Sequence, residues 1–432
     1  MIRRKDFKKH YFFYLLIGVH LLNIFSINAQ NDDVWTNDKK QWFSDNIQKI
    51  NTIHPSDTDY NDLKFLKDIL KDERFVILGE PTHGDGKVFK AKSRLIKYLH
   101  EELKFDVLVF ESGFYDVQSQ MQNATTTNEV LKAATKSIPR VWSESKQAYP
   151  AIKYVSQTEQ TRRPLILEGM DVQFNDSYSL FIEEFASETN IKKHLNEDYA
   201  NFINILQELL KNHLYKASEE DQNFFINKLD YLKIVFKRKK NIDLKRKSFW
   251  LQMLENIRAL ALTSWEQNLA FRERQMADNL LWLAENKYPN KKIIVWMASI
   301  YSFKNKSIIN TMNPKLKYGA EESFGDKLET HFNKIYTIGF TAIQGEYGAF
   351  YWNSEPEEIS KPSQNSLEGL FDNMNIEFGF LDLNKMADSE LWKNKKVLSK
   401  PLGYSEMKSV WYKNFDGLFF IKTMEPSTEL DK

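Results

Sequence analysis

The sequence RFVILGEPTHG at residues 74–84 begins as a continuous apolar run and ends in a cluster of polar, glycine and proline residues. A continuous apolar run of this length is typical of a strand that is covered on both faces of its sheet. An amphipathic stretch follows at 88–103, and a second apolar run, DVLVF, follows at 106–110. This order of strand, helix and strand predicts a βαβ unit whose two strands run parallel.

Four later segments share this apolar character and are predicted strands: residues 164–167, 292–296, 335–340 and 417–421. Residues 177–288 instead have apolar side chains at helical spacing, which predicts a long helical insertion. The basic residues at 237–247 flank a turn between two of its helices, and we interpret them as solvated helix ends. Residues 33–70 are expected to form two surface helices. The predicted fold class is α/β, with a mostly parallel sheet flanked by helices on both faces and a large helical insertion.

The composition excludes several classes of protein and site. The chain has 432 residues, of which 42% are hydrophobic and 28% charged, so a disordered or low-complexity chain is excluded. It has no cysteine, which removes disulfides, thiol nucleophiles, thiolate zinc sites and iron–sulfur clusters. A metal would have to bind His, Asp or Glu, and no two histidines have the His-x-x-x-His spacing. We therefore expect no metal and no cofactor.

Residues 1–30 have the pattern of a secretory signal peptide. A positively charged segment at 3–9 precedes a mainly apolar stretch at 11–27, and Ala29 supplies a small residue near a cleavage point. A retained anchor is the alternative, but polar residues interrupt the apolar stretch, which is short for a membrane span. We expect a mature domain of residues 31–432 that is exported, either periplasmic or secreted, without stable membrane association.

The charge balance of the mature chain limits its partners. The full sequence has 60 basic and 59 acidic residues. The signal peptide contains five of the basic residues and one of the acidic residues, so the mature chain has 55 basic and 58 acidic residues. This slightly acidic balance argues against nucleic acid as a partner. A small molecule is the expected partner, and the sequence does not specify an oligomeric state.

Three residues that follow predicted strands are the first candidates for chemistry. Glu80 and His83 come directly after the strand at 74–79, and Glu111 ends the strand at 106–110. In an open parallel sheet, ligands bind at the carboxyl ends of the strands, so these side chains are expected at one crevice. Two carboxylates beside a histidine can orient its tautomer and raise its basicity, so that it takes a proton from water. The alternative is structural: Glu80 caps the next helix and His83 forms a hydrogen bond within the turn.

Other catalytic motifs are absent from the sequence. It contains no Gly-x-Ser-x-Gly elbow, no phosphate-binding loop and no Gly-x-Gly-x-x-Gly fingerprint. Water activated by a side chain remains as the nucleophile of a hydrolase.

Several segments resemble the erythromycin esterase family. GEPTHG at 79–84, the helix residues that follow it, and FDVLVFESG at 105–113 are similar to the family's N-terminal signature. Further similarities lie in GMDVQ at 169–173, in residues 272–282 and in IGF at 338–340. The resemblance implies a metal-free hydrolysis of an ester or lactone, with His83 as general base and Glu80 and Glu111 shaping the site. It also implies supporting or substrate-binding roles for the following residues: Lys92, Arg94, Trp142, Asp171, Gln173, Arg272 and Tyr301.

The chain departs from the family pattern in three places. Where the family reads Trp-Ala-His-Asn-x-His after the fourth strand, this chain has Ala298 and Tyr301 in place of the two histidines. Lys92 stands where some members have Arg, which keeps the charge but loses the planar fork. Lys146 replaces a glutamate that follows Trp142, with Glu144 as the nearby substitute.

These observations give one leading hypothesis and two alternatives. The leading one is an exported hydrolase of erythromycin esterase type whose substrate is a small ester or lactone. The first alternative is a catalytically degenerate ligand-binding protein on the same scaffold, because both motif histidines are replaced. The second is a metal-binding or haem-binding module, which rests on fold analogy alone.

Overall fold

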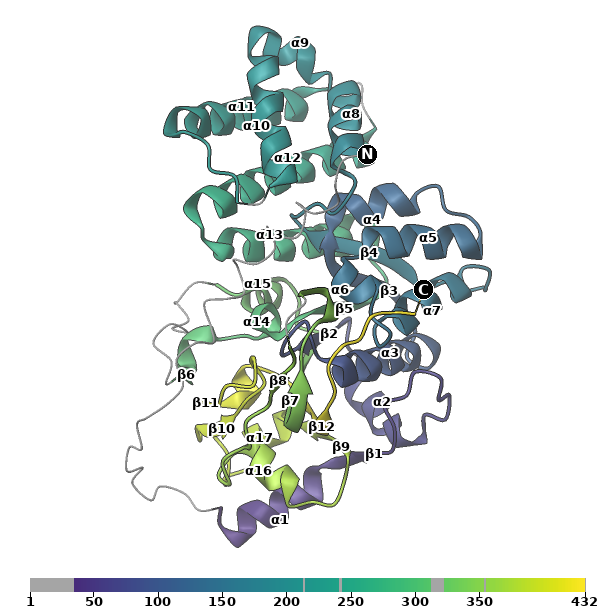
Figure 1. Ribbon diagram of the computed structural model, residues 1–432, viewed down its shortest axis with the longest axis vertical. Helices are drawn as coiled ribbons and strands as arrows, with labels where there is room; N and C mark the ends of the chain where they lie inside the picture. Colours follow the sequence, from purple (N-terminus) through teal and green to yellow (C-terminus); the bar gives the residue numbers. More distant parts are fainter. Residues whose placement is uncertain (1–34, 213, 241–242, 312–321, 353–354, 432) are drawn as a thin grey trace.

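A nine-stranded sheet forms the centre of the protein, and six of its strands are parallel. The computed structural model describes residues 35–431, apart from 213, 241–242, 312–321 and 353–354. The strands are ordered β1-β9-β12-β7-β2-β5-β3-β4, with β8 paired to β7 (Figure 1). Every pair from β12 to β4 is parallel, whereas β1, β9 and β8 pair antiparallel. The bounds are β1 (Gln48–Ile50), β2 (Phe75–Glu80), β3 (Phe105–Gly113), β4 (Ile166–Asp171), β5 (Lys292–Ala298), β7 (Ile335–Tyr347), β8 (Glu357–Glu358), β9 (Phe378–Asp382) and β12 (Gly417–Met424).

The central strands are covered on both faces because their side chains alternate between two cores. Val76 and Leu78 of β2 pack in one core, and Phe75 and Ile77 pack in the other. The first core is closed by α3 (Gly86–Glu101), α5 (Thr127–Ser137) and α7 (Tyr149–Thr158). The second is closed by the helical insertion and α15 (Phe324–His331). The predicted α/β class, with helices on both faces of a mostly parallel sheet, is confirmed.

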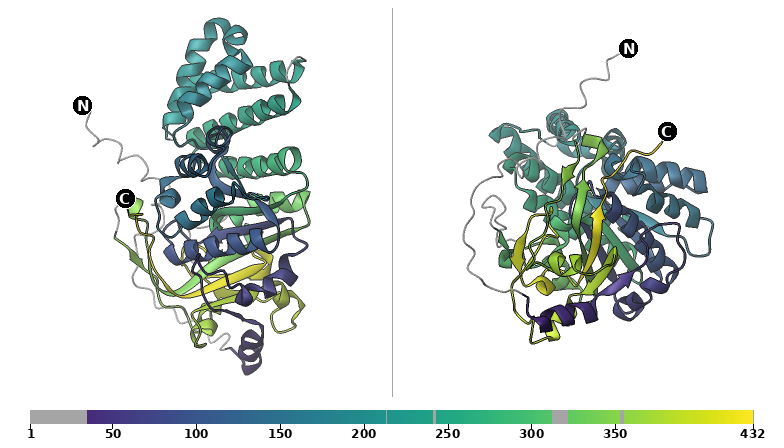
Figure 2. Two further views of the ribbon diagram at one scale, coloured as in Figure 1. Left: turned by 90° about the vertical axis from the view of Figure 1, so that its right-hand side faces the viewer. Right: turned by 60° about the horizontal axis from the view of Figure 1, so that its bottom comes forward.

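The helical insertion lies between β4 and β5 and extends away from the sheet (Figures 1 and 2). Ser218 and Asp243 each cap a helix by accepting a backbone N–H, so α11 and α12 are separate helices with the basic residues at their ends. A surface hollow of about 510 Å³ between α9 and α11 lies in this region. The helices are α8 (Tyr178–Thr189), α9 (Ile191–Leu195), α10 (Tyr199–Lys211), α11 (Glu219–Arg238), α12 (Leu244–Glu266) and α13 (Leu269–Trp282).

A third core lies beside the antiparallel edge of the sheet. It includes Phe43, Phe371 and Trp392, and it brings the first helix of the described chain against its C-terminal part. A three-stranded sheet of β6 (Asn310–Thr311), β10 (Val397–Ser399) and β11 (Met407–Ser409) flanks it. The other helices are α1 (Asn37–Asn46), α2 (Phe65–Leu70), α4 (Phe114–Met121), α6 (Arg140–Ser143), α14 (Ser299–Ser302), α16 (Leu367–Asp372) and α17 (Asn384–Asp388).

Two features of the sheet differ from the simplest expectation. The segment 33–70 contains α1 and α2, but it also contributes β1 to the sheet edge. The strands β2 and β3 are not neighbours, because β5 lies between them and pairs with both. The predicted signal peptide, residues 1–30, lies outside the described residues. Within the described residues, no helix is long and apolar enough to cross a membrane.

Candidate active site

The loop between β2 and α3 carries His83 and is fixed by close backbone contacts. A side chain at Gly84 would place its Cβ 2.6 Å from the backbone of Gly348, so only glycine fits this approach. The buried Asp85 accepts the backbone N–H and the hydroxyl of Thr82, at 2.7 and 2.8 Å. Burial raises the pKa of Asp85 to about 7, although the hydrogen bonds from Thr82 act in the opposite direction.

Glu80 is a fully buried carboxylate at the end of β2. The Lys92 ammonium, from α3, donates to Glu80 Oε2 and also to the Met297 carbonyl at 3.1 Å. Both side chains are 0% exposed. Burial acts to raise the pKa of Glu80, but the charge of Lys92 and the hydrogen bond with His83 outweigh it, so the pKa is lowered. Burial also lowers the pKa of the Lys92 ammonium, and the charge of Glu80 opposes this shift. Their direct contact favours the ionised form of both groups, so Lys92 keeps Glu80 ionised inside the protein.

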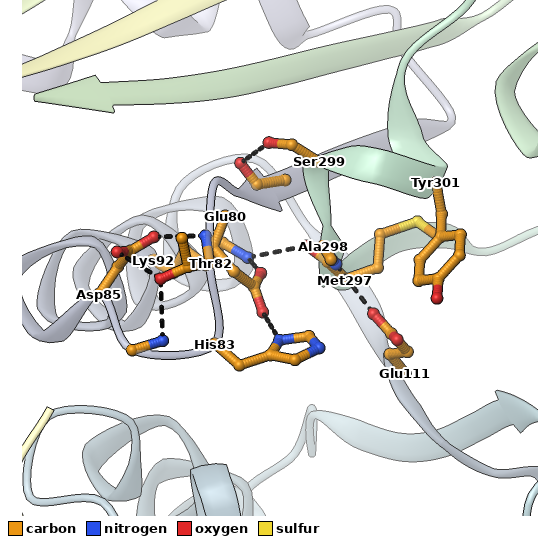
Figure 3. A network of polar contacts seen from close by, with 12 residues as sticks. Glu80, Thr82, His83, Asp85, Lys92, Glu111, Met297, Ala298, Ser299 and Tyr301 are labelled. Atoms are coloured by element: carbon orange, nitrogen blue, oxygen red, sulfur yellow. Dashed lines mark hydrogen bonds and ion pairs between the residues drawn. The ribbon is translucent and has the colours of Figure 1, made fainter. Parts of the chain in front are cut away.

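His83 lies against Glu80 (Figure 3) and against the indole of Trp142. Its Nδ1 is 3.2 Å from Glu80 Oε1, and its ring is edge-to-face with Trp142 at 5.0 Å between centroids. The His83 side chain is 18% exposed, in contrast to the buried groups around it. Burial lowers the pKa of His83. The hydrogen bond to Glu80 and the charges of Glu111 and Glu80 raise it by more than burial lowers it, so the net shift is upward.

A second group of charged residues surrounds Glu111, at the end of β3. Arg272 Nη2 donates to Glu111 Oε1 at 2.9 Å and to Asp171 Oδ2 at 2.6 Å, and its Nε donates to Asp171 Oδ1 at 2.9 Å. The guanidinium thus binds Asp171 through two parallel hydrogen bonds. Burial raises the pKa of Glu111, and the charge of Arg272 opposes this shift. Acceptance at both Glu111 oxygens is the pattern of an ionised carboxylate.

The two residues in place of the family histidines both take part in this network. The backbone N–H of Ala298 donates to Glu111 Oε2 at 2.9 Å. The hydroxyl of Tyr301 accepts from Arg272 Nη1 at 2.6 Å, and the guanidinium carbon lies 5.1 Å from the centre of the Tyr301 ring. Burial raises the pKa of Tyr301 to about 12, so this residue remains a neutral phenol at physiological pH.

Strand alternation explains why the site has two halves. Glu80 continues the row of Val76 and Leu78 toward the core of α3, whereas Glu111 continues the row of Val107 and Val109 toward the insertion. The strand β5 lies between them and supplies the Ala298 N–H and the Met297 carbonyl. His83, on the loop, is electrostatically coupled to both carboxylates. Both acids therefore lie at one rim of the sheet.

The charges of this cluster favour a protonated His83. Three carboxylates, Glu80, Glu111 and Asp171, are paired with two cations, Lys92 and Arg272. The group carries one net negative charge while His83 is neutral and none when it is protonated. A proton gained by His83 is therefore stabilised by its surroundings.

Three residues that the sequence placed at or near the site contact other groups than expected. Arg94 does not face this cluster: its guanidinium is buried against Asp62, at 2.8 Å between Nη2 and Oδ1. Glu144 does not replace the family's glutamate either, because it pairs with Arg140 four residues before it. Gln173 contacts Asp171 only through its backbone N–H, at 3.3 Å, among the hydrogen bonds identified in the described residues.

The sequence pattern did not single out Asp85 or the backbone of Met297 and Ala298. Asp85 immediately follows the GEPTHG motif, and its Thr-x-x-Asp spacing to Thr82 is a local signal for a turn that side chains stabilise. No comparable signal exists for the backbone contacts, because they depend on β5 lying between β2 and β3. Within the described part of the chain, no group of three or more His, Asp or Glu side chains is arranged to hold a metal ion.

Comparison with known sequences gives the family. The sequence model of the erythromycin esterase family matches residues 100–424. The chain belongs to the erythromycin esterase family. The matched residues include Glu111, Asp171 and Arg272, whereas the GEPTHG motif precedes them.

Two known proteins are similar to this chain in sequence. A homologue named hydrolase YbfO, from Bacillus subtilis strain 168, is 27% identical over 422 residues, covering 89% of this chain and 91% of the relative. An erythromycin esterase type II of Escherichia coli is 34% identical over 79 residues, 18% of this chain and 19% of that protein.

Two solved structures have the same fold. A Bacillus cereus protein has a TM-score of 0.72 and 21% identity, covering 91% of this chain and 98% of that one. A mutant of the erythromycin esterase EreC, in its open conformation, has a TM-score of 0.65 and 16% identity, covering 89% and 100%. The two likenesses are structural and show the shared α/β architecture.

Proposed function

We propose that this protein hydrolyses a small ester or lactone with a water molecule that His83 activates as general base. The observation that carries the proposal is the contact of His83 Nδ1 with Glu80 Oε1 at 3.2 Å, while Lys92 keeps Glu80 ionised. A carboxylate at Nδ1 accepts the Nδ1–H of the imidazole, and this selects the tautomer whose basic nitrogen is Nε2. The 18% exposure of His83 supports access to water and substrate from outside the cluster.

The proposed reaction needs one proton transfer in each direction. His83 takes a proton from water as the water oxygen attacks the carbonyl carbon, which forms a tetrahedral intermediate with a negative oxygen. The carbon–oxygen bond to the alcohol then breaks, and the His83 imidazolium returns the proton to the departing oxygen. The products are a carboxylic acid and an alcohol, or a hydroxy acid when the substrate is a lactone.

Glu111 supports this role through its charge. It raises the pKa of His83, which stabilises the imidazolium that forms during attack. Arg272 and the Ala298 N–H hold Glu111 in place, and Trp142 limits the orientations of the His83 ring. Glu111 therefore acts on the base through its charge, and Trp142 acts as a positioning residue.

A ligand-binding protein without turnover is the second candidate. It is favoured by Ala298 and Tyr301, since the family pattern has histidines at both positions, and neither side chain here is a base at neutral pH. The Glu80–His83 pair argues for the hydrolase, because a binding site has no need of a buried carboxylate that selects one histidine tautomer.

The test is a screen of small neutral esters and lactones with the wild-type protein, His83→Ala and His83→Gln. Each assay is run with and without a chelator, to separate a metal-free reaction from one that depends on a metal. The proposal predicts turnover that persists with chelator and is lost in both variants. Binding of an apolar ester without turnover in any assay would support the second candidate instead.

Export is part of the same proposal. The charged and apolar pattern of residues 1–30 supports a cleaved signal peptide, and an exported hydrolase would meet its substrate outside the cytoplasm.

A further inference from the structure

Tyr301 is held in one orientation at the edge of the site. It lies on α14, directly after β5, and its ring packs in the second core with 9% of its surface exposed. Its hydroxyl accepts a hydrogen bond from Arg272 Nη1 at 2.6 Å. Arginine has donors only, so the Tyr301 oxygen is the acceptor in this contact and its own hydrogen points elsewhere.

The hydroxyl hydrogen of Tyr301 has no acceptor among the hydrogen bonds of the described residues. The donors to the nearby carboxylates in the described residues are other groups: Glu111 accepts from Arg272 and Ala298, and Asp171 accepts from Arg272 and from the Gln173 N–H. Figure 3 shows the Glu111 side chain between His83 and Tyr301. The site therefore contains a phenol O–H donor whose oxygen is held by Arg272, across Glu111 from the candidate base.

We propose that Tyr301 donates its hydroxyl hydrogen bond to the negative oxygen that forms on the carbonyl of the ester or lactone. This inference rests on the hydrolytic function proposed above and assigns a second residue to the same reaction. Water attack moves the carbonyl electron pair onto the carbonyl oxygen, and the Tyr301 O–H stabilises that charge without transferring its proton. When the intermediate collapses, the electron pair returns to the carbonyl, and His83 alone returns a proton to the leaving oxygen.

The surroundings of Tyr301 suit this role. Burial raises its pKa to about 12, so the phenol keeps its hydrogen over the whole range in which a histidine titrates. The guanidinium of Arg272 withdraws electron density from the phenol oxygen, which strengthens the O–H as a donor. Because Arg272 is itself bound to Asp171 and Glu111, the donor is oriented before substrate arrives.

The experiment compares Tyr301→Phe with the wild type on an ester that the wild type hydrolyses. Phenylalanine keeps the ring packing and removes only the hydroxyl. Removal of one oxyanion donor typically lowers kcat by about 10² to 10³-fold, and we expect that loss with little change in KM. The matched control is Tyr154→Phe, because Tyr154 is also buried but its hydroxyl binds Glu101 and His100 on α3. That control should retain wild-type kcat.

Two further measurements separate an oxyanion donor from a structural residue. A phosphonate analogue of the tetrahedral intermediate should lose affinity for Tyr301→Phe by the same factor as kcat/KM, whereas a non-reactive substrate analogue should bind unchanged. The acid limb of the pH–rate profile, which reports His83, should stay in place. Equal loss of affinity for both ligands, or a wild-type kcat in Tyr301→Phe, would overturn the inference while leaving a His83-dependent hydrolase intact. Absence of turnover by the wild type on every ester would instead remove the proposed function and this inference together.

Discussion

The backbone N–H of Ala298 donates to Oε2 of Glu111 at 2.9 Å, joining the end of β5 to the end of β3. This contact does not depend on the side chain at position 298. An alanine in place of the family's histidine therefore leaves Glu111 anchored, and the negative charge that His83 experiences is retained. The missing histidine side chain does not disconnect the two halves of the site.

Restoring the family pattern with Ala298→His and Tyr301→His should lower turnover rather than raise it. Ala298 is 6% exposed and packed in the second core, so a histidine there overfills the site, and the second change removes the Tyr301 hydroxyl. The measurement is kcat/KM of the double variant and of each single variant. A faster double variant would show that the missing histidines limit this site.

Loss of the Glu111 charge should make His83 less basic. In Glu111→Gln the charge that raises the pKa of His83 is gone, so the imidazole should titrate at a lower pH than in the wild type. NMR titration of labelled histidine measures this directly, with Glu144→Gln as the control because Glu144 pairs with Arg140 outside the site. An unchanged His83 titration in Glu111→Gln would show that the two groups are not coupled.

Replacing Lys92 with methionine should destabilise the protein strongly. The variant leaves Glu80 buried without its cation, and breaking a buried ion pair in this way typically costs about 3 to 5 kcal/mol. Urea denaturation compares it with Lys146→Met, whose exposed pair with Asp431 is worth about 1 kcal/mol or less. Equal stability of the two variants would mean that Glu80 is not an ionised partner of Lys92.

Asp85 should make the free energy of unfolding fall as the pH rises. Its pKa is about 7 in the folded protein and 3.8 in the unfolded reference, so the native state binds the extra proton in this interval. Stability attributable to Asp85 is therefore present below about pH 4 and is lost as the pH rises through about 7. Asp85→Asn should flatten the dependence between about pH 4 and 7 in denaturation experiments. The same slope in both proteins would contradict the assignment.

The exported protein should begin between Asn28 and Asp33, because the charged and apolar segments end before Ala29. N-terminal sequencing of protein recovered outside the cytoplasm determines the cleavage point. Intact Met1 in a membrane fraction would identify a retained anchor.

The sequence predicted the parallel strands and the pairing of Glu80 with His83 because both depend on local order along the chain. Lys92 and Arg94 show where that reasoning ends. Two positions apart on a helix, they point about 200° from one another, so only Lys92 faces Glu80, whereas Arg94 binds Asp62. The sequence motif gave both basic residues the same supporting role, whereas the helix geometry places only Lys92 in the site.

The sequence could not specify the contacts between strands that lie far apart in the chain. The place of β5 between β2 and β3 puts Ala298 beside Glu111, and this depends on strands almost 200 residues apart in the chain. The edge strand β1 has only three residues, Gln48–Ile50, and lacks a continuous apolar run. The strand β9 has a short apolar run, FGFL at 378–381, which was not among the predicted strands, and it pairs antiparallel with β1 and β12.

The pH dependence of kcat/KM in the wild type and in His83→Gln tests most directly whether His83 activates the attacking water. In the wild type, kcat/KM should rise with pH through a value above 6.5, the ordinary pKa of histidine, because Glu80 and Glu111 raise the pKa of His83. In His83→Gln that limb should vanish and the rate should fall by about 10² to 10⁴-fold, the usual contribution of a general base. A His83→Gln protein that keeps the wild-type rate and pH profile would contradict the mechanism.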